Sequence, residues 1–306
     1  ILSSVPSSAA VYRRVSYRRA PQLSVVIPFF NPGPALSSTV ARVLELADAR
    51  SVRVEVLCVD DGSSDGSAQL LPTDSRVTLV TFEHNRGKGA ALQMGLSLAV
   101  GEFRGFVDSD GDIDPVVLFD YYRLARQHGH EFVYADKTLA ASSSQSSFSR
   151  KVISAGFRMF SSVLLLSRPR DTQTGAKLFS ASATRRLLSM ATEQRFALDL
   201  ELFTIADRMG IATVAAPVAL NARMSGSSVS SSSVLRTAGD VVRIARRKHF
   251  SRAYSPVSRA RLVSGPVLGV APGFSHVSEV PSSAGAFGVT APGGAFGVTA
   301  PVSVAA

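Results

Sequence analysis

Short apolar, β-branched runs alternate with segments of helical periodicity along most of this chain. Strands that alternate with helices favour a parallel sheet with right-handed crossovers. We therefore expect an α/β fold in which a mostly parallel, Rossmann-like sheet is flanked by helices. The expected strands are residues 23–28, 52–59, 77–81, 103–107, 131–134 and 214–220. The expected helices are residues 36–49, 90–100, 116–128, 150–166, 196–210 and 234–250, with a further helical run from Ser67.

Polar clusters follow three of these strands where each strand ends. They are Asp60–Gly66, His84–Gly89 and Asp108–Asp112. In an open parallel sheet, ligands bind beyond the carboxyl ends of the strands, so we expect the three clusters to converge on one crevice. A role in the core alone gives no reason for a polar cluster at each of these strand ends. The sequence therefore predicts a single ligand site built from all three.

The third cluster begins a series of carboxylates at alternate positions, Asp108, Asp110, Asp112 and Asp114. Four such groups repel one another unless a cation lies among them. Mg²⁺ is typically held by one or two carboxylates together with substrate phosphates, so we expect a divalent cation here. A solvated acidic turn with Asp114 as a helix cap is the alternative. A calcium loop is disfavoured, because its pattern requires a glutamate at the last position.

The first two clusters suit the other parts of a nucleotide. Asp60 or Asp61 can accept hydrogen bonds from a uracil or a ribose, or can simply form an Asp-Gly turn. The segment Asn85–Gly89 precedes a helix, so its backbone N–H groups and the side chain of Arg86 or Lys88 suit an anionic ligand. A flexible entry to the helix is the alternative for this segment.

Six motifs together carry a family resemblance. In order and spacing, four of them resemble the family 2 glycosyltransferases of the GT-A fold: Val25–Asn31, Val59–Ser63, Asn85–Gly89 and Asp108–Asp110. Two more, Asp171–Phe179 and Phe196–Phe203, are similar to the polyprenyl-phosphate branch of that family. This branch includes the dolichyl-phosphate glucose and mannose synthases. The resemblance covers about residues 22–225.

The resemblance implies roles for the donor-side residues. Pro28 and Asn31 would lie beside the nucleotide base, and Asp60 or Asp61 would contact the uracil or ribose. Asn31 is followed by Pro32, where these families usually have a glutamate, so one contact near the nucleotide is left open. The full set expected to bind the donor is Pro28, Asn31, Asp60, Asp61, Arg86, Lys88 and Asp108.

The resemblance also implies how the diphosphate and the metal are held. Asp108 and Asp110 would form a DxD motif at the donor diphosphate and a Mg²⁺ or Mn²⁺ ion. Asp112 stands where this branch often has a second ligand on the metal side. We therefore expect Asp110 and Asp112 to be the metal ligands.

An acceptor phosphate is expected in the second half of the domain. The branch resemblance predicts an anionic acceptor, and Arg150, Arg170, Gln173 and Lys177 are the candidates to bind it. Charge complementation at a helix C-terminus is the alternative for these bases. Asp199 lies in an apolar stretch, where an acid is costly unless paired, so it either orients the acceptor site or pairs with an arginine.

These features predict a metal-dependent, inverting transfer of a hexose from a nucleotide sugar to a polyprenyl or dolichyl phosphate. Segments 85–89 and 173–177 look more like the glucose synthases, which favours UDP-glucose over GDP-mannose. Such an acceptor is largely ionised near neutral pH, its second pKa being about 6, so a strong general base is unnecessary. The expected catalytic residues are Asp108, Asp110, Arg150, Lys177 and Asp199.

Other functions remain open at this point. One alternative is mannosyl transfer from GDP-mannose to a polyprenyl phosphate. Another is a family 2 transferase with a soluble or glycan acceptor, in which Asp199 or Glu201 would be a general base. A third is a scaffold that binds a nucleotide sugar without catalysis, although the intact acidic cluster is unfavourable to it.

The net charge of +10 is carried by the flanks of the chain, since residues 21–233 contain equal numbers of basic and acidic side chains. A neutral core disfavours a nucleic-acid partner, and basic flanks suggest an anionic membrane surface. No apolar run is long enough to span a bilayer, so we expect a peripheral protein. The single cysteine fits a reducing compartment, hence the cytoplasmic face.

The expected organisation has four parts. Residues 1–20 would be a flexible basic arm, and residues 21–225 the GT-A glycosyltransferase domain. Residues 226–256 would contain a Ser-rich linker and a basic amphipathic helix suited to a headgroup region. A C-terminal helix packed on the domain is the alternative for that helix. Residues 257–306 would form a disordered low-complexity tail.

Overall fold

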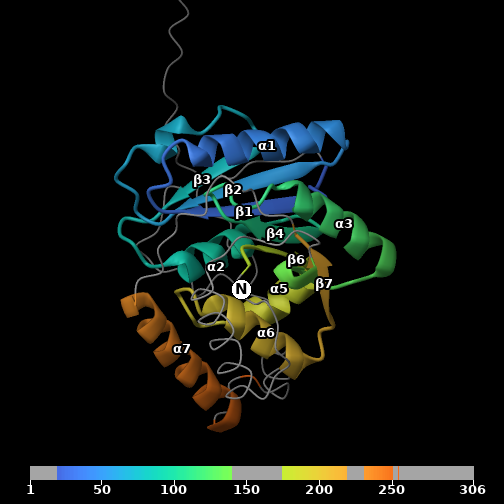
Figure 1. Cartoon of the computed structure of the whole chain (residues 1–306). Helices are drawn as coiled ribbons and strands as arrows, with labels where there is room; N and C mark the ends of the chain where they lie inside the picture. Colours follow the sequence, from blue (N-terminus) through green and yellow to red (C-terminus); the bar gives the residue numbers. More distant parts are fainter. Residues whose placement is uncertain (1–18, 140–173, 219–230, 251–253, 255–306) are drawn as a thin grey trace, which may run out of the picture. The chain divides into compact units, whose positions relative to one another are not determined.

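A seven-stranded sheet with helices on its two faces forms the part of the chain that the computed structural model describes, residues 19–139, 174–218, 231–250 and 254 (Figure 1). The strands are β1 Leu23–Phe29, β2 Val54–Asp60, β3 Val77–Thr81, β4 Phe103–Val107, β5 Phe132–Asp136, β6 Ala176–Ser180 and β7 Thr213–Pro217. The α-helices are α1 Ala35–Ala49, α2 Lys88–Leu98, α3 Val116–His128, α5 Ala181–Leu188, α6 Leu198–Met209 and α7 Ser231–Phe250. Two short 3-10 helices are η1 Ser67–Leu70 and η2 Lys137–Leu139.

The strand order is β3-β2-β1-β4-β6-β5-β7. Strands β1, β2, β3 and β4 pair in parallel, as do β5 and β7. Strand β6 lies between β4 and β5 and is antiparallel to both. The expected Rossmann-like sheet, mostly parallel and flanked by helices, is therefore confirmed, with one antiparallel strand inserted at its centre.

Both faces of the sheet are covered, which explains why its central strands are mostly apolar. Val25 and Ile27 of β1 belong to a core with α1 and α3, and Val26 belongs to a second core with α2, α5 and α6. Figure 1 shows α1 on one side of the sheet and α2, α5 and α6 on the other. Cys58 on β2 is completely buried, and this burial raises the pKa of its thiol far above the ordinary value.

Several expected element boundaries were wrong. The helical run from Ser67 is only one 3-10 turn, because Leu71, which precedes Pro72, adopts an extended conformation. The last strand ends at Pro217, with Val218 the last described residue after it. Strand β6 and helix α5 were not expected at all; α5 begins after Ser180, whose hydroxyl accepts a hydrogen bond from Ala183 N.

Helix α7 begins three residues before the expected start, so the end of the expected linker is helical. Its side chains Val241, Ile244 and Ala245 pack on Ala197 and Leu200. These apolar groups are covered by the domain and are not available to a lipid headgroup region. For this part of the helix, the packed alternative is therefore correct.

Among the helices of the described ranges, none combines the length and the apolar character that crossing a bilayer requires. The expected helix 150–166, almost all of the arm 1–20 and the tail 257–306 lie outside the described residues.

Candidate functional site

The three polar clusters meet beyond the carboxyl ends of β2, β3 and β4, as the sequence predicted. The Asp61 carboxylate accepts hydrogen bonds from Arg86 N at 2.7 Å and from Gly87 N at 2.9 Å. Lys88 Nζ lies 2.5 Å from Asp108 Oδ1. The first cluster is thus joined to the second through Asp61, and the second to the third through Lys88.

The turn after β1 is fastened to the cluster after β2. Ser64 N donates to Asn31 Oδ1 at 2.8 Å, and Asn31 N donates to Ser63 Oγ at 3.0 Å. Asn31 has a φ of 51°, in the left-handed region that asparagine tolerates better than most residues. Asp60 Oδ1 accepts a hydrogen bond from Ser63 N at 2.7 Å, and Pro28 is buried near the end of β1. These contacts give the predicted base-side residues a fixed frame.

The two neighbouring carboxylates Asp60 and Asp61 differ in their surroundings. Burial raises the pKa of Asp61, and the hydrogen bonds from Arg86 N and Gly87 N act in the opposite direction. Both oxygens of Asp61 accept hydrogen bonds from this loop. Asp61 therefore holds the loop that begins α2.

The acidic cluster divides into two parts. Asp114 Oδ1 accepts a hydrogen bond from Val116 N at 2.9 Å at the start of α3, so it does serve as a helix cap. Asp110 is exposed and accepts a hydrogen bond from Asp112 N at 3.0 Å. Burial raises the pKa of Asp112, and the charge of Asp110 raises it further. Asp108, Asp110 and Asp112 remain as the part of the cluster available to a ligand.

The carboxylate oxygens of the acidic cluster suit a divalent cation that also binds a ligand. The described residues contain no group of three or more His, Cys, Asp or Glu side chains arranged to hold a metal ion. However, Asp112 Oδ1 is buried and has no hydrogen-bond donor among the described residues, and Asp108 Oδ1 is buried with Lys88 Nζ at 2.5 Å. Mg²⁺ usually takes only one or two carboxylates and completes its shell with phosphates and water. These oxygens match that mode of binding and not an all-protein cage.

The two basic side chains of the second cluster, Lys88 and Arg86, have different surroundings. Burial would lower the pKa of Lys88, but the carboxylates of Asp108, Asp199 and Asp110 raise it above the ordinary value. Lys88 therefore stays an ammonium ion next to Asp108. The Arg86 guanidinium lies over the Phe82 ring, 4.9 Å from its centroid. Lys88 is the cation nearest to the acidic cluster in this loop.

Lys177 and Asp199 form a buried ion pair between β6 and α6. Lys177 is completely buried, its Nζ donates to Thr174 O at 2.8 Å, and it lies 3.0 Å from Asp199 Oδ1. That contact lacks the angles of a hydrogen bond, and Asp199 Oδ1 has no other donor among the described residues. The pairing expected for Asp199 is present, with a lysine in place of an arginine. Contact of Lys177 with an acceptor stays a prediction, and Arg150, Arg170 and Gln173 lie outside the described residues.

Glu201, weighed as a general base from the sequence, is completely buried. Its Oε2 accepts hydrogen bonds from Thr192 N and Glu193 N, each at 2.8 Å, and its Oε1 accepts one from Tyr254 OH at 2.6 Å. Both oxygens are occupied by donors of the protein. This carboxylate is part of the scaffold around the site.

Gly175 has a structural role that the sequence reasoning did not assign. Its carbonyl accepts a hydrogen bond from Asp108 N at 3.2 Å. A Cβ at this position would lie 2.0 Å from Asp108 Oδ2, so only glycine leaves room for that carboxylate. The signal in the sequence was a glycine directly before a strand, where close approach of another group is a common reason for it.

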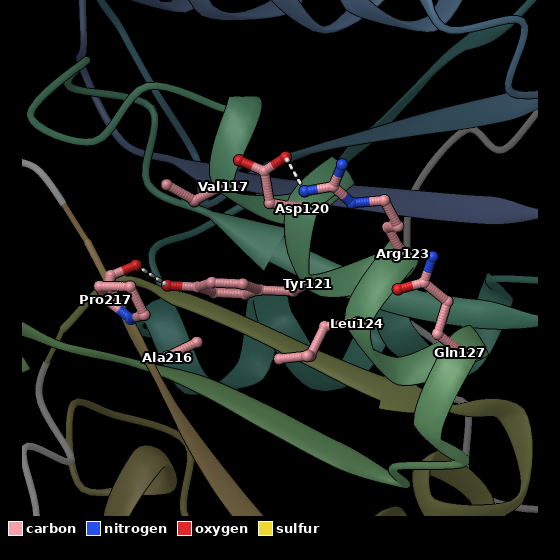
Figure 2. A pocket seen from close by; sticks show the side chains of 8 residues that line it. All are labelled: Val117, Asp120, Tyr121, Arg123, Leu124, Gln127, Ala216 and Pro217. Carbon is pink, nitrogen blue, oxygen red and sulfur yellow. Dashed lines mark hydrogen bonds and ion pairs between the residues drawn. The ribbon is translucent and has the colours of Figure 1, made fainter.

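A separate groove lies on the far part of the sheet, between α3 and β7 (Figure 2). Its volume is about 320 Å³. Figure 2 shows Tyr121 OH bonded to the Pro217 carbonyl and Asp120 paired with Arg123 at its wall. None of the residues of the three polar clusters lines it, so we do not assign it to the site.

Comparison with known families gives a match over most of the described sheet. The model of the family described as "Glycosyl transferase family 2" matches residues 24–187. The chain is 28% identical over 245 residues to a dolichyl-phosphate β-glucosyltransferase of Dictyostelium discoideum, covering 72% of this chain and 73% of that protein. It is 31% identical over 203 residues to the Homo sapiens protein of the same name, covering 60% of this chain and 63% of that protein.

Solved structures share the fold. Glucosyl-3-phosphoglycerate synthase from Mycobacterium tuberculosis, in complex with UDP, has a TM-score of 0.55 and 20% identity, covering 74% of this chain and 80% of that one. A complex of the same enzyme with Mn²⁺, UDP-glucose and phosphoglyceric acid also has a TM-score of 0.55, at 20% identity, with coverage of 74% and 79%. These similarities concern the arrangement of the sheet and its helices.

Proposed function

This chain belongs to glycosyl transferase family 2 and has the GT-A fold, and we propose that it transfers glucose from UDP-glucose to a polyprenyl phosphate such as dolichyl phosphate. The observation that carries the proposal is the meeting of the three strand-end clusters around Asp108. The similarity to dolichyl-phosphate β-glucosyltransferases supports glucose as the sugar and a lipid phosphate as the acceptor.

On the donor side, each cluster has its own task in this proposal. Asp60 contacts the uracil or ribose, since Asp61 is committed to the loop of Arg86 and Gly87. The N-terminus of α2, which begins at Lys88, faces the diphosphate, because a helix N-terminus favours an anion. The Asp108 carboxylate forms an ion pair with the Lys88 ammonium group.

Asp110 and Asp112 would hold Mg²⁺ or Mn²⁺, which when bound neutralises charge that builds up on the departing diphosphate. Asp112 Oδ1, which is buried and has no hydrogen-bond donor in the part of the chain that the structure describes, supports this assignment. The structural neighbour that was crystallised with Mn²⁺ and UDP-glucose supports the choice of ion for this fold.

On the acceptor side, an oxygen of the lipid phosphate attacks the anomeric carbon as the bond to UDP breaks, which inverts the configuration. An ionised phosphate requires no base to remove a proton. Asp199 and Glu201, the two bases weighed for a hydroxyl acceptor, are buried and engaged by Lys177 and by backbone N–H groups. Because these contacts engage both carboxylates, a phosphate acceptor, which requires no base, is favoured over a hydroxyl acceptor.

A polyprenyl phosphate is anchored in a membrane, so the reaction would take place at a membrane surface. We assign the protein to the cytoplasmic face as a peripheral protein. The basic flanks of the chain support attraction to anionic lipids.

The direct test is a panel of UDP- and GDP-sugars offered to the full chain with a short polyprenyl phosphate, in Mg²⁺ or Mn²⁺ and in chelator. We expect a glucosylated lipid from UDP-glucose that is lost in chelator. A mannosylated lipid from GDP-mannose would change the assigned sugar, but the protein would still be a glycosyltransferase with a polyprenyl phosphate acceptor. Transfer to hydroxyl acceptors alone, or UDP binding with no transfer, would contradict the proposal in favour of the glycan-acceptor or scaffold alternative.

Gly175→Ala is expected to impair transfer strongly, because the added Cβ would lie 2.0 Å from Asp108 Oδ2 and must displace the carboxylate. Misplacement of a catalytic group by about 1 Å can cost about 100-fold in rate, and overpacking costs about 1–3 kcal/mol of stability. We expect kcat/KM to fall by about 100-fold with a moderate loss in Tm. Steady-state kinetics and thermal unfolding measure both.

Gly239→Ala is the matched control. Gly239 lies on α7 with nothing within 4 Å of an added Cβ, so alanine there should keep activity and stabilise the helix slightly. Equal activity of the Gly175 and Gly239 variants would show that the Asp108 carboxylate does not depend on the space at residue 175.

A further inference from the structure

A short segment just before α6, Thr192–Arg195, supports the loop that holds Lys88; we name it the bracing segment. Gln194 O accepts a hydrogen bond from Ala90 N at 2.8 Å, in the first turn of α2. One residue before it, Glu193 O accepts one from Gln93 Nε2 at 2.7 Å. A Cβ at Gly89 would lie 2.5 Å from Arg195 O, so the loop lies directly against this segment.

The bracing segment is itself fixed by a buried carboxylate. Glu201 has no exposed surface, and its Oε2 accepts hydrogen bonds from both Thr192 N and Glu193 N at 2.8 Å. The Glu193 carboxylate is also nearly buried, with 3% of the residue exposed, and lies in the same cluster. Two buried acids so close together are costly unless cations compensate them.

Helix α7 and the residue Tyr254 supply that compensation. Arg247 Nη1 lies 2.7 Å from Glu193 Oε1 and 3.3 Å from Glu201 Oε1. Arg243 Nη1 lies 3.0 Å from Glu193 Oε2, and Tyr254 OH donates to Glu201 Oε1 at 2.6 Å. The packing of Val241 and Ile244 on Ala197 and Leu200 fixes the helix at this position, and Figure 1 shows α7 running beside α6.

We propose that Arg247 and Tyr254 are positioning residues for the donor diphosphate. Arg247 pairs with Glu201 and with Glu193 of the bracing segment, and Tyr254 donates to Glu201. Glu201 accepts hydrogen bonds from the bracing segment, which in turn contacts the first turn of α2, the helix that begins at Lys88. None of them touches the donor, so their effect is transmitted through the placement of that loop. The C-terminal helix, which lies beyond the region matched to the family model, thereby sets the affinity for the nucleotide sugar.

This inference rests on the proposed function, because it assigns the loop to the donor. Its mode of action predicts which kinetic quantity changes. A displaced loop weakens contacts made with the donor before reaction, so KM for UDP-glucose and Kd for UDP should rise together while kcat changes less. A role limited to stability would lower Tm and leave Kd for UDP unchanged in the folded protein.

The test compares Arg247→Met, Arg247→Lys and Tyr254→Phe in the full chain, with Arg246→Met as control. Arg246 is an exposed neighbour on the same helix. Calorimetry measures Kd for UDP with Mn²⁺, well below the Tm of each variant, and steady-state assays give KM and kcat. Loss of an outer-shell partner of a metal ligand typically costs about 10–100-fold in metal affinity or activity, and we expect an effect at the lower end of that range for UDP bound with Mn²⁺.

We expect Arg247→Met to raise Kd for UDP by about tenfold, Arg247→Lys to restore most of the affinity, and Tyr254→Phe to raise Kd by about two- to tenfold. Should Arg247→Met fail to fold, Tyr254→Phe decides, because it removes a single hydroxyl. Variants that bind UDP as tightly as Arg246→Met would overturn the inference alone. A folded wild-type protein that does not bind UDP would overturn the proposed function, and the inference with it.

Discussion

Asp110→Asn is expected to lower kcat/KM for glucose transfer by about 10²–10³-fold. Charge neutralisation by a bound metal is worth several kcal/mol at a developing oxyanion, and each 1.36 kcal/mol is a factor of ten in rate. Asp110 is exposed, and within the described ranges its carboxylate accepts one hydrogen bond, from Asp112 N, so asparagine should be accommodated without loss of fold. Kinetics with saturating Mg²⁺ or Mn²⁺ measure the effect, and Mn²⁺ binding in the presence of UDP provides a readout that is independent of turnover.

Asp120→Asn is the matched control for this prediction. Asp120 is a surface carboxylate on α3 that pairs with Arg50 at 2.9 Å and belongs to none of the three polar clusters. Exposed ion pairs contribute little, so this variant should behave as wild type. If Asp110→Asn retained both Mn²⁺ binding and full activity, Asp110 would not be a metal ligand.

Asp199→Asn is expected to destabilise the protein by about 3–5 kcal/mol, because it leaves a buried lysine without its counter-charge. Lys177 has no exposed surface, and Asp199 Oδ1 lies 3.0 Å from its ammonium group. The centroid of the Phe106 ring lies 5.2 Å from Lys177 Nζ, and this cation–π contact cannot replace a carboxylate. Urea unfolding at neutral pH measures the change in the free energy of unfolding.

The double variant Lys177→Met with Asp199→Leu distinguishes an effect of the pair on stability from an effect on catalysis. Replacing both members of a buried pair with apolar residues is often neutral or stabilising, so most of the lost stability should return. Stability that returned without transfer activity would support the predicted catalytic role of the pair. A single variant as stable as wild type would show that the pair is not buried in solution.

Much of the donor side could be predicted from local sequence. The apolar runs that end in Asp60 and Val107 identify strands by themselves, and the rule that ligands bind at the carboxyl ends of parallel strands brings their loops together. The hydrogen bond from Val116 N to Asp114 at the start of α3 agrees with the helix cap that the sequence offered as part of the alternative reading of the acidic cluster. These features depend on short stretches of sequence and on one topological rule.

Strand β6 could not be recognised in the same way, because Lys177 interrupts its apolar pattern. A lysine at the second position of a five-residue run normally indicates an exposed position. Its partner Asp199 lies on α6, far along the chain, and only the folded structure brings the two together. The placement of β6 between β4 and β5 likewise depends on long-range contacts.

Helix α7 was predicted, but its neighbours were not. An amphipathic pattern is the same whether the apolar face meets lipid or protein. The choice depended on the surface formed by Ala197 and Leu200, which periodicity does not reveal. The acceptor contacts of Arg150, Arg170 and Gln173 stay predictions, since these residues lie outside the described ranges.

The buried cysteine makes the chain convenient for optical experiments. Cys58 is the only cysteine, it has no exposed surface, and burial raises the pKa of its thiol, which disfavours the reactive thiolate. A second cysteine introduced at an exposed position, such as Glu83 at the edge of the donor loop, would therefore take a fluorophore selectively without removal of the native one. Emission from that dye could report nucleotide binding in real time and in the presence of vesicles, independently of any assay for product.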